Sequence, residues 1–278
     1  MNGRIEFDMP ENEYHARPEL SSTQARRILE SPAKYRWLVD HPEPPRAVFD
    51  VGTAAHSKIL GVGAGAVAYP DEHLTPSGFV STKAATVLWA AEQRAAGLTP
   101  ITPDQMDAVN AMAEAVLAHP TARVLLEQPG HPEASVFATD PDTGVGLRAR
   151  FDFLPDDGPR PIAVDVKTAL DASPRGFGKA VGNHGYYVQR GHYLDTLRLA
   201  GGHDLAEFLF VVVEKDPPHL VAVHQLERIL AEAGIDRARQ ARHLYRECTD
   251  RDEWPGYPTD VHLVTAPYWL VAEQETYA

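Results

Sequence analysis

The sequence predicts an α/β protein, with a central mixed β-sheet flanked by helices and an N-terminal helical addition. Residues 21–126 are dominated by helical periodicity and alanine, whereas the pattern changes to strands from Ala134 onward. A strongly apolar strand at 205–214 then lies between helical stretches, as in α/β cores. The chain has 278 residues, 44% of them hydrophobic, which is enough to bury a sizeable core.

The N-terminal region is expected to begin with an irregular arm over residues 1–20. Ser21 and the residues after it form a helix-start signal, and Ser31-Pro32 begins a second short helix. The two helices form a hairpin, followed by a proline-rich linker at 41–45. This hairpin carries four basic residues: Arg26, Arg27, Lys34 and Arg36.

A helix is predicted over 48–60, where Val51, Ala55 and Ile59 share one face and Gly52 and His56 an adjacent one. A short strand is expected at 67–70. The segment 81–126 is largely helical by its alanine content, with breaks at 97–103 and near 119–120.

A strand from Ala134 leads into a β-hairpin, whose two strands, 145–154 and 161–168, flank a Pro-Asp-Asp-Gly-Pro turn. Asp152 is expected at the end of the first strand. Asp165 and Lys167 lie two residues apart on the second, so they point to the same face. Charged side chains inside an apolar strand are costly unless they are paired or bind a metal, so this hairpin is the candidate for chemistry.

The remaining chain alternates helices and strands. Helices are expected over 173–180, 186–200 and 226–247, and the strand 205–214 has a neighbour at 220–224. The aromatic, proline-rich tail, 254–278, is expected to pack across the body. We divide the chain into an N-terminal helical region (1–130), a core (131–250) and a tail (251–278), all parts of one integrated domain.

Composition narrows the function classes. Cys248 is the single cysteine, so one chain offers neither a disulfide framework nor four cysteines for an iron-sulfur cluster. No apolar run suits a membrane span or a signal peptide, which favours a cytoplasmic protein. The net charge of -13 argues against wrapping nucleic acid with the whole surface.

The hairpin suits a hard divalent cation, because magnesium binds one or two carboxylates together with substrate phosphate. Asp152 and Asp165 fit that role, and Lys167 is placed to orient an attacking water. The alternative is a surface salt bridge between Asp165 and Lys167. His56, among small residues of its helix, is a possible third ligand; the alternative is an ordinary core or surface histidine.

Two other positions accompany the hairpin. Gln189 and Tyr193 lie one turn apart on one helix face, where they either support the site or are ordinary amphipathic residues. Glu133, just before a predicted strand, is expected to be a surface glutamate; the alternative is a carboxylate that either binds the metal itself or supports a residue that does.

Four segments, taken in chain order, resemble the motifs of the PD-(D/E)xK nuclease superfamily. They are Gly52-Thr53-Ala54-Ala55-His56, Arg150-Phe151-Asp152, Val164-Asp165-Val166-Lys167-Thr168 and Gln189-x-x-x-Tyr193. Within it, the chain is similar to the exonuclease VIII (RecE-type) branch of phage and prophage recombination nucleases. The segments at 13–15, 20–23 and 31–35 are also similar to that branch. Phe151, where many relatives have proline, and Asp165, where glutamate is commoner, depart from the usual pattern.

The resemblance implies a restriction-endonuclease-like core and a Mg²⁺-dependent exonuclease, with Mn²⁺ as a substitute ion. Such enzymes degrade linear duplex DNA from the 5′ end, leave 3′ single-stranded tails and work with a RecT-type single-strand annealing protein. It further implies a homo-oligomeric ring, tetrameric rather than trimeric, in a bacterial or phage-infected cell. Carried over residue by residue, the metal ligands are His56, Asp152, Asp165 and the main-chain carbonyl of Val166, with Lys167 serving the attacking water and Gln189 and Tyr193 supporting the site.

A ring with a basic lumen would reconcile this function with the acidic net charge. The candidate phosphate contacts are Arg26, Arg27, Lys83, Arg148, Arg150 and Arg175. Three alternatives stay open: a nuclease of CRISPR adaptation or of helicase-nuclease repair complexes, an endonuclease, and a non-catalytic DNA-end-binding protein on a nuclease scaffold.

Overall fold

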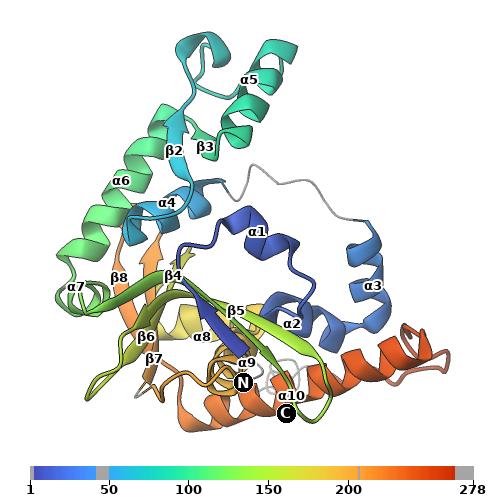
Figure 1. Cartoon of the computed structure of the whole chain (residues 1–278). Helices are drawn as coiled ribbons and strands as arrows, with labels where there is room; N and C mark the ends of the chain where they lie inside the picture. The colour runs from blue at the N-terminus through green and yellow to red at the C-terminus, as the bar shows by residue number, and fades with distance from the viewer. Residues whose placement is uncertain (1–2, 42–49, 206, 267–278) are drawn as a thin grey trace, which may run out of the picture.

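A six-stranded sheet forms the centre of the molecule in the computed structural model, which describes residues 3–41, 50–205 and 207–266 (Figure 1). Its strand order is β1-β4-β5-β6-β7-β8. The strands β6 and β7 are parallel and the other neighbours antiparallel, so the predicted mixed sheet is confirmed. The strands are β1 (Gly3–Glu6), β4 (Gly130–Thr139), β5 (Gly146–Pro155), β6 (Ile162–Ala169), β7 (Glu207–Glu214) and β8 (Val221–Gln225).

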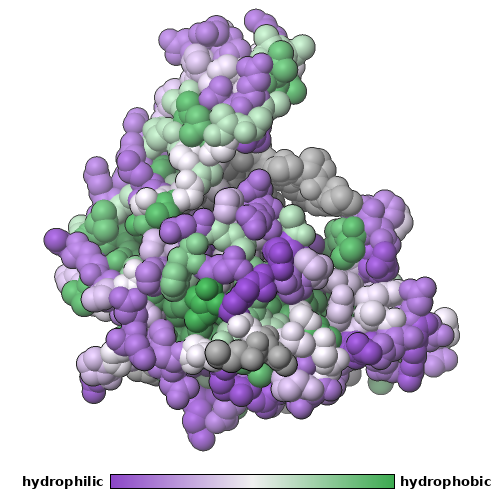
Figure 2. Space-filling view, viewed as in Figure 1, coloured by the Kyte–Doolittle hydropathy of each residue, from purple (hydrophilic) through white to green (hydrophobic). Residues whose placement is uncertain are grey.

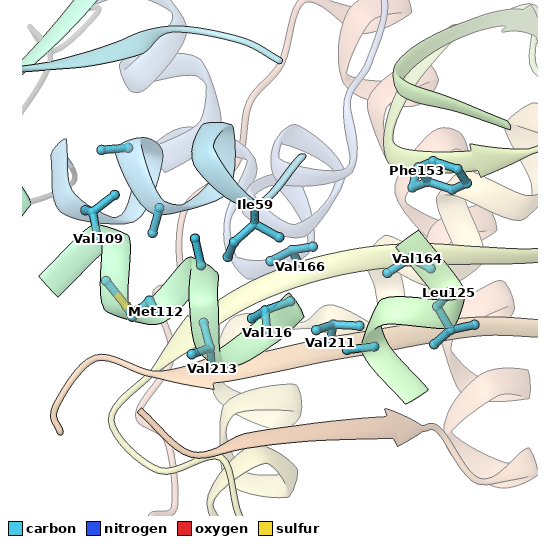
Figure 3. Close-up of a cluster of buried hydrophobic side chains, with 14 of the residues drawn as sticks. Ile59, Val109, Met112, Val116, Leu125, Phe153, Val164, Val166, Val211 and Val213 are labelled. Atoms are coloured by element: carbon cyan, nitrogen blue, oxygen red, sulfur yellow. The ribbon is translucent and has the colours of Figure 1, made fainter. Parts of the chain in front are cut away.

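One face of the sheet is covered by α4 (Asp50–Leu60), α6 (Pro103–Ala118) and α7 (Pro120–Leu126). Figure 3 shows the core beneath them, where Ile59, Val109 and Met112 lie over the strands that carry Val166 and Val213. Because successive strand residues face opposite sides, Val164 and Val166 enter this core while Ala163 enters the other. The apolar runs of β6 and β7 are therefore buried on both faces.

The opposite face is covered by α8 (Pro174–His184) and α9 (Tyr186–Leu199), which meet Phe208 and Phe210 of β7. Gly185, with φ 64°, takes the left-handed conformation that ends α8 and lets α9 begin at once. The long helix α10 (Arg228–Arg251) packs on α9. This arrangement places Gln189 of α9 against β6, where it contacts Asp165.

The predicted helical hairpin is confirmed as α2 (Ser22–Glu30) and α3 (Pro32–Asp40). Ser21 and Gln24 form a reciprocal capping box, and Ser31 caps α3 with Pro32 in its first turn. Trp254, after α10, stacks on Tyr35 with ring centroids 5.5 Å apart. The predicted linker lies mostly outside the described residues.

Several elements differ from the sequence-based expectation. The arm at 1–20 contains β1 and α1 (Glu11–Ala16), because the short β1 gains its hydrogen bonds from β4 rather than from local propensity. The break at 97–103 contains β3 (Leu98–Ile101), which pairs in parallel with β2 (Gly65–Ala68). These strands belong to a lobe with the short 3₁₀ helix η2 (Asp71–His73) and α5 (Ala84–Ala95) (Figure 1).

Of the tail predicted to pack across the body, the described part, 254–266, packs mainly at its start, and residues 267–278 lie outside the described residues. Beyond Trp254, the described residues to 266 are mostly exposed, and Val261, Leu263 and Val264 lie open to solvent. Figure 2 shows a largely hydrophilic face with hydrophobic residues gathered in patches, one of them on the lobe that carries α5. Among the described residues, no helix is both long and apolar enough to cross a membrane.

Candidate active site

The site begins where β5 and β6 separate. β4 and β5 pair along nearly their whole lengths, whereas Phe153 and Val164 are the paired residues between β5 and β6. Beyond that pair, the Asp152 carboxylate takes the place of a backbone acceptor: its Oδ2 accepts the N–H of Val166 at 2.6 Å. Asp152 therefore lies inside β5, which continues to Pro155, and not at the strand end as the sequence suggested.

Asp165 and Lys167 point to the same face of β6, as their spacing predicts, and form an ion pair there. Asp165 is 1% exposed. Gln189 of α9 donates from Nε2 to Asp165 Oδ1 at 2.6 Å, while the Lys167 ammonium lies 5.1 Å from the centroid of the Tyr186 ring. The alternative of a surface salt bridge is excluded by this burial.

His56 reaches the site from α4. Gly52 lies one turn earlier and faces Thr168 of β6, because a Cβ at this position would meet Thr168 Oγ1 at an ordinary contact distance of 3.5 Å. Ala55 and Ile59 anchor α4 in the core, which turns the imidazole toward β5. His56 Nε2 lies 2.9 Å from Asp152 Oδ2.

Glu133 completes the site, whereas the sequence predicts a surface glutamate at this position. Its side chain is 17% exposed, and Oε1 lies 3.4 Å from His56 Nδ1. His56, Glu133 and Asp152 offer ligand atoms that all lie within 4.8 Å of one another. The only indication of this role in the sequence is a glutamate next to an apolar strand. The position of Glu133 opposite Asp152 depends on the fold and could not be predicted from that pattern.

The pKa values reflect the crowding of charge. Burial raises the pKa of Asp165 to about 6, although Lys167 opposes the shift. Burial also disfavours the charged forms of Asp152 and His56, but their mutual attraction outweighs it, lowering the pKa of Asp152 and raising that of His56 to about 9. The pKa of Lys167 is raised despite burial, because Asp165 and Asp152 face it.

The donor set fits a divalent cation. Two carboxylates and an imidazole meet at one point, and Asp165 Oδ2 is buried with no hydrogen bond apart from its ion contact with Lys167. Carboxylate oxygens are ordinary ligands for such ions, and the imidazole becomes one when the ion displaces its proton. His56, Glu133, Asp152 and Asp165 are therefore the residues that would hold metal. The main-chain carbonyl of Val166 stays a predicted ligand.

Tyr193 lies one turn from Gln189 and is buried in the core, where its ring packs against Phe151 and Phe208. Burial raises the pKa of its hydroxyl, which also interacts with Gln189. Tyr193 is thus linked to Asp165 through Gln189 and does not face solvent.

The proposed DNA contacts divide into two groups. Arg148 is buried and donates to the carbonyls of Tyr14, His15 and Arg17, so its guanidinium is committed to the chain's own backbone. Arg150 is committed as well, to Glu133 and the Met9 carbonyl. Of the remaining candidates, Arg27, Lys83 and Arg175 are exposed, whereas the half-buried Arg26 donates to the carbonyls of Ser22 and His184 and to Thr23 Oγ1.

Residues 21–266 match the family described as a PDDEXK-like domain of unknown function (DUF3799). The chain belongs to this family. The match contains every residue of the site described above, and the PD-(D/E)xK fold that the sequence predicts is thereby confirmed. No curated protein sequence matches the chain.

The fold has a counterpart among solved structures. A crystal structure of a "putative exonuclease" from Eubacterium rectale aligns over 96% of this chain and 98% of its own, with a TM-score of 0.59 at 10% identity. At this identity the likeness concerns the fold. Protein VC1899 from Vibrio cholerae aligns over 90% of this chain and 58% of its own at 14% identity, but its TM-score of 0.25 is too low to indicate a shared fold.

Proposed function

We propose that the protein is a metal-dependent exodeoxyribonuclease, using Mg²⁺ with Mn²⁺ as a substitute, that degrades linear duplex DNA in the 5′-to-3′ direction. The observation that carries the proposal is the meeting of Asp152, Asp165 and Lys167 on neighbouring strands, beside His56 of α4. This combination of carboxylates and an ammonium suits hydrolysis of a phosphodiester. The family and the fold support a nuclease; substrate and polarity come from the sequence resemblance.

Divalent cations at such a site supply positive charge for the phosphate and make bound water more acidic. Lys167 has a raised pKa, so at neutral pH it acts as a cation and hydrogen-bond donor toward the attacking water or the phosphate. Asp165 is mostly ionised above its pKa of about 6, and Gln189 holds one of its oxygens. The N–H of Val166 and the imidazole of His56 hold Asp152 in the same way.

In this proposal the candidate phosphate contacts are the exposed cations Arg27, Lys83 and Arg175, because Arg26, Arg148 and Arg150 donate to groups of the chain itself. An otherwise acidic surface would keep DNA binding local. We further propose a homo-oligomeric ring, tetrameric rather than trimeric. Its biological role would be to supply 3′ tails to a RecT-type single-strand annealing protein in the cytoplasm of a bacterial or phage-infected cell.

Digestion of linear duplex DNA, labelled separately at its 5′ and 3′ ends, tests the proposal. Early release of the 5′ label is expected with Mg²⁺ and not with chelator, and Asp165→Asn should release neither label. Early release of the 3′ label would overturn the polarity. Cleavage of closed circles would favour an endonuclease, and absence of cleavage together with absence of metal binding would favour a non-catalytic DNA-end-binding protein.

A further inference from the structure

The backbone of Glu133 is bent in a way that a strand residue rarely adopts. Its φ is 54°, in the left-handed region that disfavours residues with a Cβ. Pro132 pairs with Phe153 and Ala134 with Phe151, so Glu133 lies opposite Asp152, yet these two residues do not form a ladder pair. The local distortion turns the carboxyl group toward Asp152 and His56.

Two carboxylates meet one imidazole at this point. His56 Nδ1 lies 3.4 Å from Glu133 Oε1, and His56 Nε2 lies 2.9 Å from Asp152 Oδ2. The three residues offer ligand atoms within 4.8 Å of one another. Left-handed backbone at residues other than glycine clusters at ligand-binding positions, and the bend at Glu133 accords with such a role.

Arg150 fixes the direction of Glu133. The guanidinium pairs with Oε2, which leaves Oε1 on the side of His56. Arg150 is itself held by the Met9 carbonyl at 3.1 Å and lies 5.4 Å from the centroid of the Tyr14 ring. It is thus a positioning residue for the carboxylate, anchored by the N-terminal arm.

The donor types distinguish this cluster from the pair formed by Asp152 and Asp165. Asp165 adds only oxygens, which suits Mg²⁺, whereas His56 adds an imidazole nitrogen. Imidazole binds transition ions better than Mg²⁺, and Mn²⁺ accepts both nitrogen and carboxylate ligands. A cation in the cluster and a cation between Asp152 and Asp165 would share Asp152 as a ligand.

From these contacts, we infer that His56, Glu133 and Asp152 form a mixed nitrogen and oxygen cation site that prefers Mn²⁺ to Mg²⁺, with Glu133 as a direct ligand. The inference rests on the proposed metal-dependent function and assigns a residue and an ion preference to it. It predicts Mn²⁺ binding that depends on Glu133 in the absence of DNA.

The test is Mn²⁺ binding to the full chain without DNA, measured by the EPR signal of free Mn²⁺, with Mg²⁺ as competitor. Glu133→Gln retains an acceptor for Arg150 but loses the charge, so it should weaken Mn²⁺ binding at one site by about tenfold or more. Glu133→Asp retains a carboxylate on a shorter side chain, so its Mn²⁺ affinity should lie between those of the wild type and of Glu133→Gln. Glu30→Gln, an exposed glutamate paired with Lys34, is the matched control and should bind as the wild type does.

His56→Asp replaces the nitrogen ligand with oxygen and should reduce the preference for Mn²⁺ over Mg²⁺. Folding of each variant is checked by circular dichroism in chelator. Glu133→Gln and Glu133→Asp binding Mn²⁺ with wild-type affinity would overturn the inference, even if the wild type cleaves DNA. Loss of binding in Glu133→Gln, with no cleavage by the wild type, would instead overturn the proposed function and leave the cation site standing.

Discussion

The carboxylate of Asp152 accepts the backbone N–H of Val166, 2.6 Å away on the neighbouring strand. One side chain therefore closes the gap between β5 and β6 and also faces His56. The same atom, Oδ2, makes both contacts. This double role links the stability of the sheet to the chemistry of the site.

Replacing Asp152 with asparagine separates these two roles. The amide oxygen still accepts the N–H of Val166 but no longer forms an ion pair with His56, so we expect the free energy of unfolding to fall by about 1 to 3 kcal/mol. The loss of charge should abolish cation binding and lower cleavage by about a thousandfold or more. Asp152→Ala, which also removes the acceptor, should be less stable than Asp152→Asn in urea denaturation. Equal stability of the two variants would show that the hydrogen bond does not hold the sheet.

Gln189 should matter for stability as well as for activity. Its amide donates to Asp165 Oδ1 in a buried position, so Gln189→Ala leaves a buried carboxylate oxygen without a donor. We expect a loss of about 1 to 3 kcal/mol in the free energy of unfolding. Gln189→Glu places a second acid beside Asp165 and should be less stable than Gln189→Ala at pH 8, with the gap closing near pH 5. A gap that does not depend on pH would contradict the contact.

The buried His192 should make the folded protein less stable in acid. It is fully buried, Nε2 lies 3.0 Å from the Arg148 carbonyl oxygen, and burial with the nearby Arg242 lowers the pKa of the imidazole to about 4. The unfolded chain binds this proton near pH 6.5 and the folded chain only near 4, so stability falls as the pH drops through this window. The difference between these two pKa values corresponds to about 3 kcal/mol in the free energy of unfolding.

His192→Gln retains a donor for the Arg148 carbonyl but does not titrate. In urea denaturation between pH 7 and pH 4, the wild type should therefore lose about 3 kcal/mol more than this variant. Parallel pH curves for the two proteins would refute the assignment.

The backbone strain at Glu133 can be measured by comparing two substitutions. Glycine adopts a φ of 54° freely, whereas alanine keeps the Cβ and its penalty. We expect Glu133→Gly to be more stable than Glu133→Ala by about 1 kcal/mol in chelator. At Glu207, at the start of β7 with a β-strand backbone, the order should reverse, because glycine weakens strands. Alanine being the more stable at 133 would argue against strain.

The sequence predicts the parts of this protein that depend on local patterns. The two-residue spacing of Asp165 and Lys167 sets their common face, and the helical spacing of Gly52 and His56 sets theirs, so both pairs lie as predicted. Ser21 and Ser31 likewise fix the starts of α2 and α3 through local hydrogen bonds. Local rules suffice where the deciding contact is a few residues away.

The parts that could not be predicted depend on contacts distant in sequence. Arg148 looks like a surface cation, but the carbonyls of the N-terminal arm, more than 130 residues away, bind it in the interior. Glu133 owes its role to a left-handed backbone opposite Asp152, which no propensity of glutamate suggests. β3 includes Pro100, which disfavours a strand except at an edge, and it forms only because β2 lies beside it.

The central claim is that the Asp165 and Lys167 pair performs catalysis and is not a structural ion pair. Its most direct test is cleavage and binding of linear duplex DNA by Lys167→Ala, with Lys215→Ala as the matched control because Lys215 is an exposed lysine that follows β7. With Mg²⁺, Lys167→Ala should cleave about a thousandfold more slowly or worse, yet bind DNA in calcium as the wild type does. Lys215→Ala should be unaffected in both assays. Cleavage by Lys167→Ala at the wild-type rate would contradict the account.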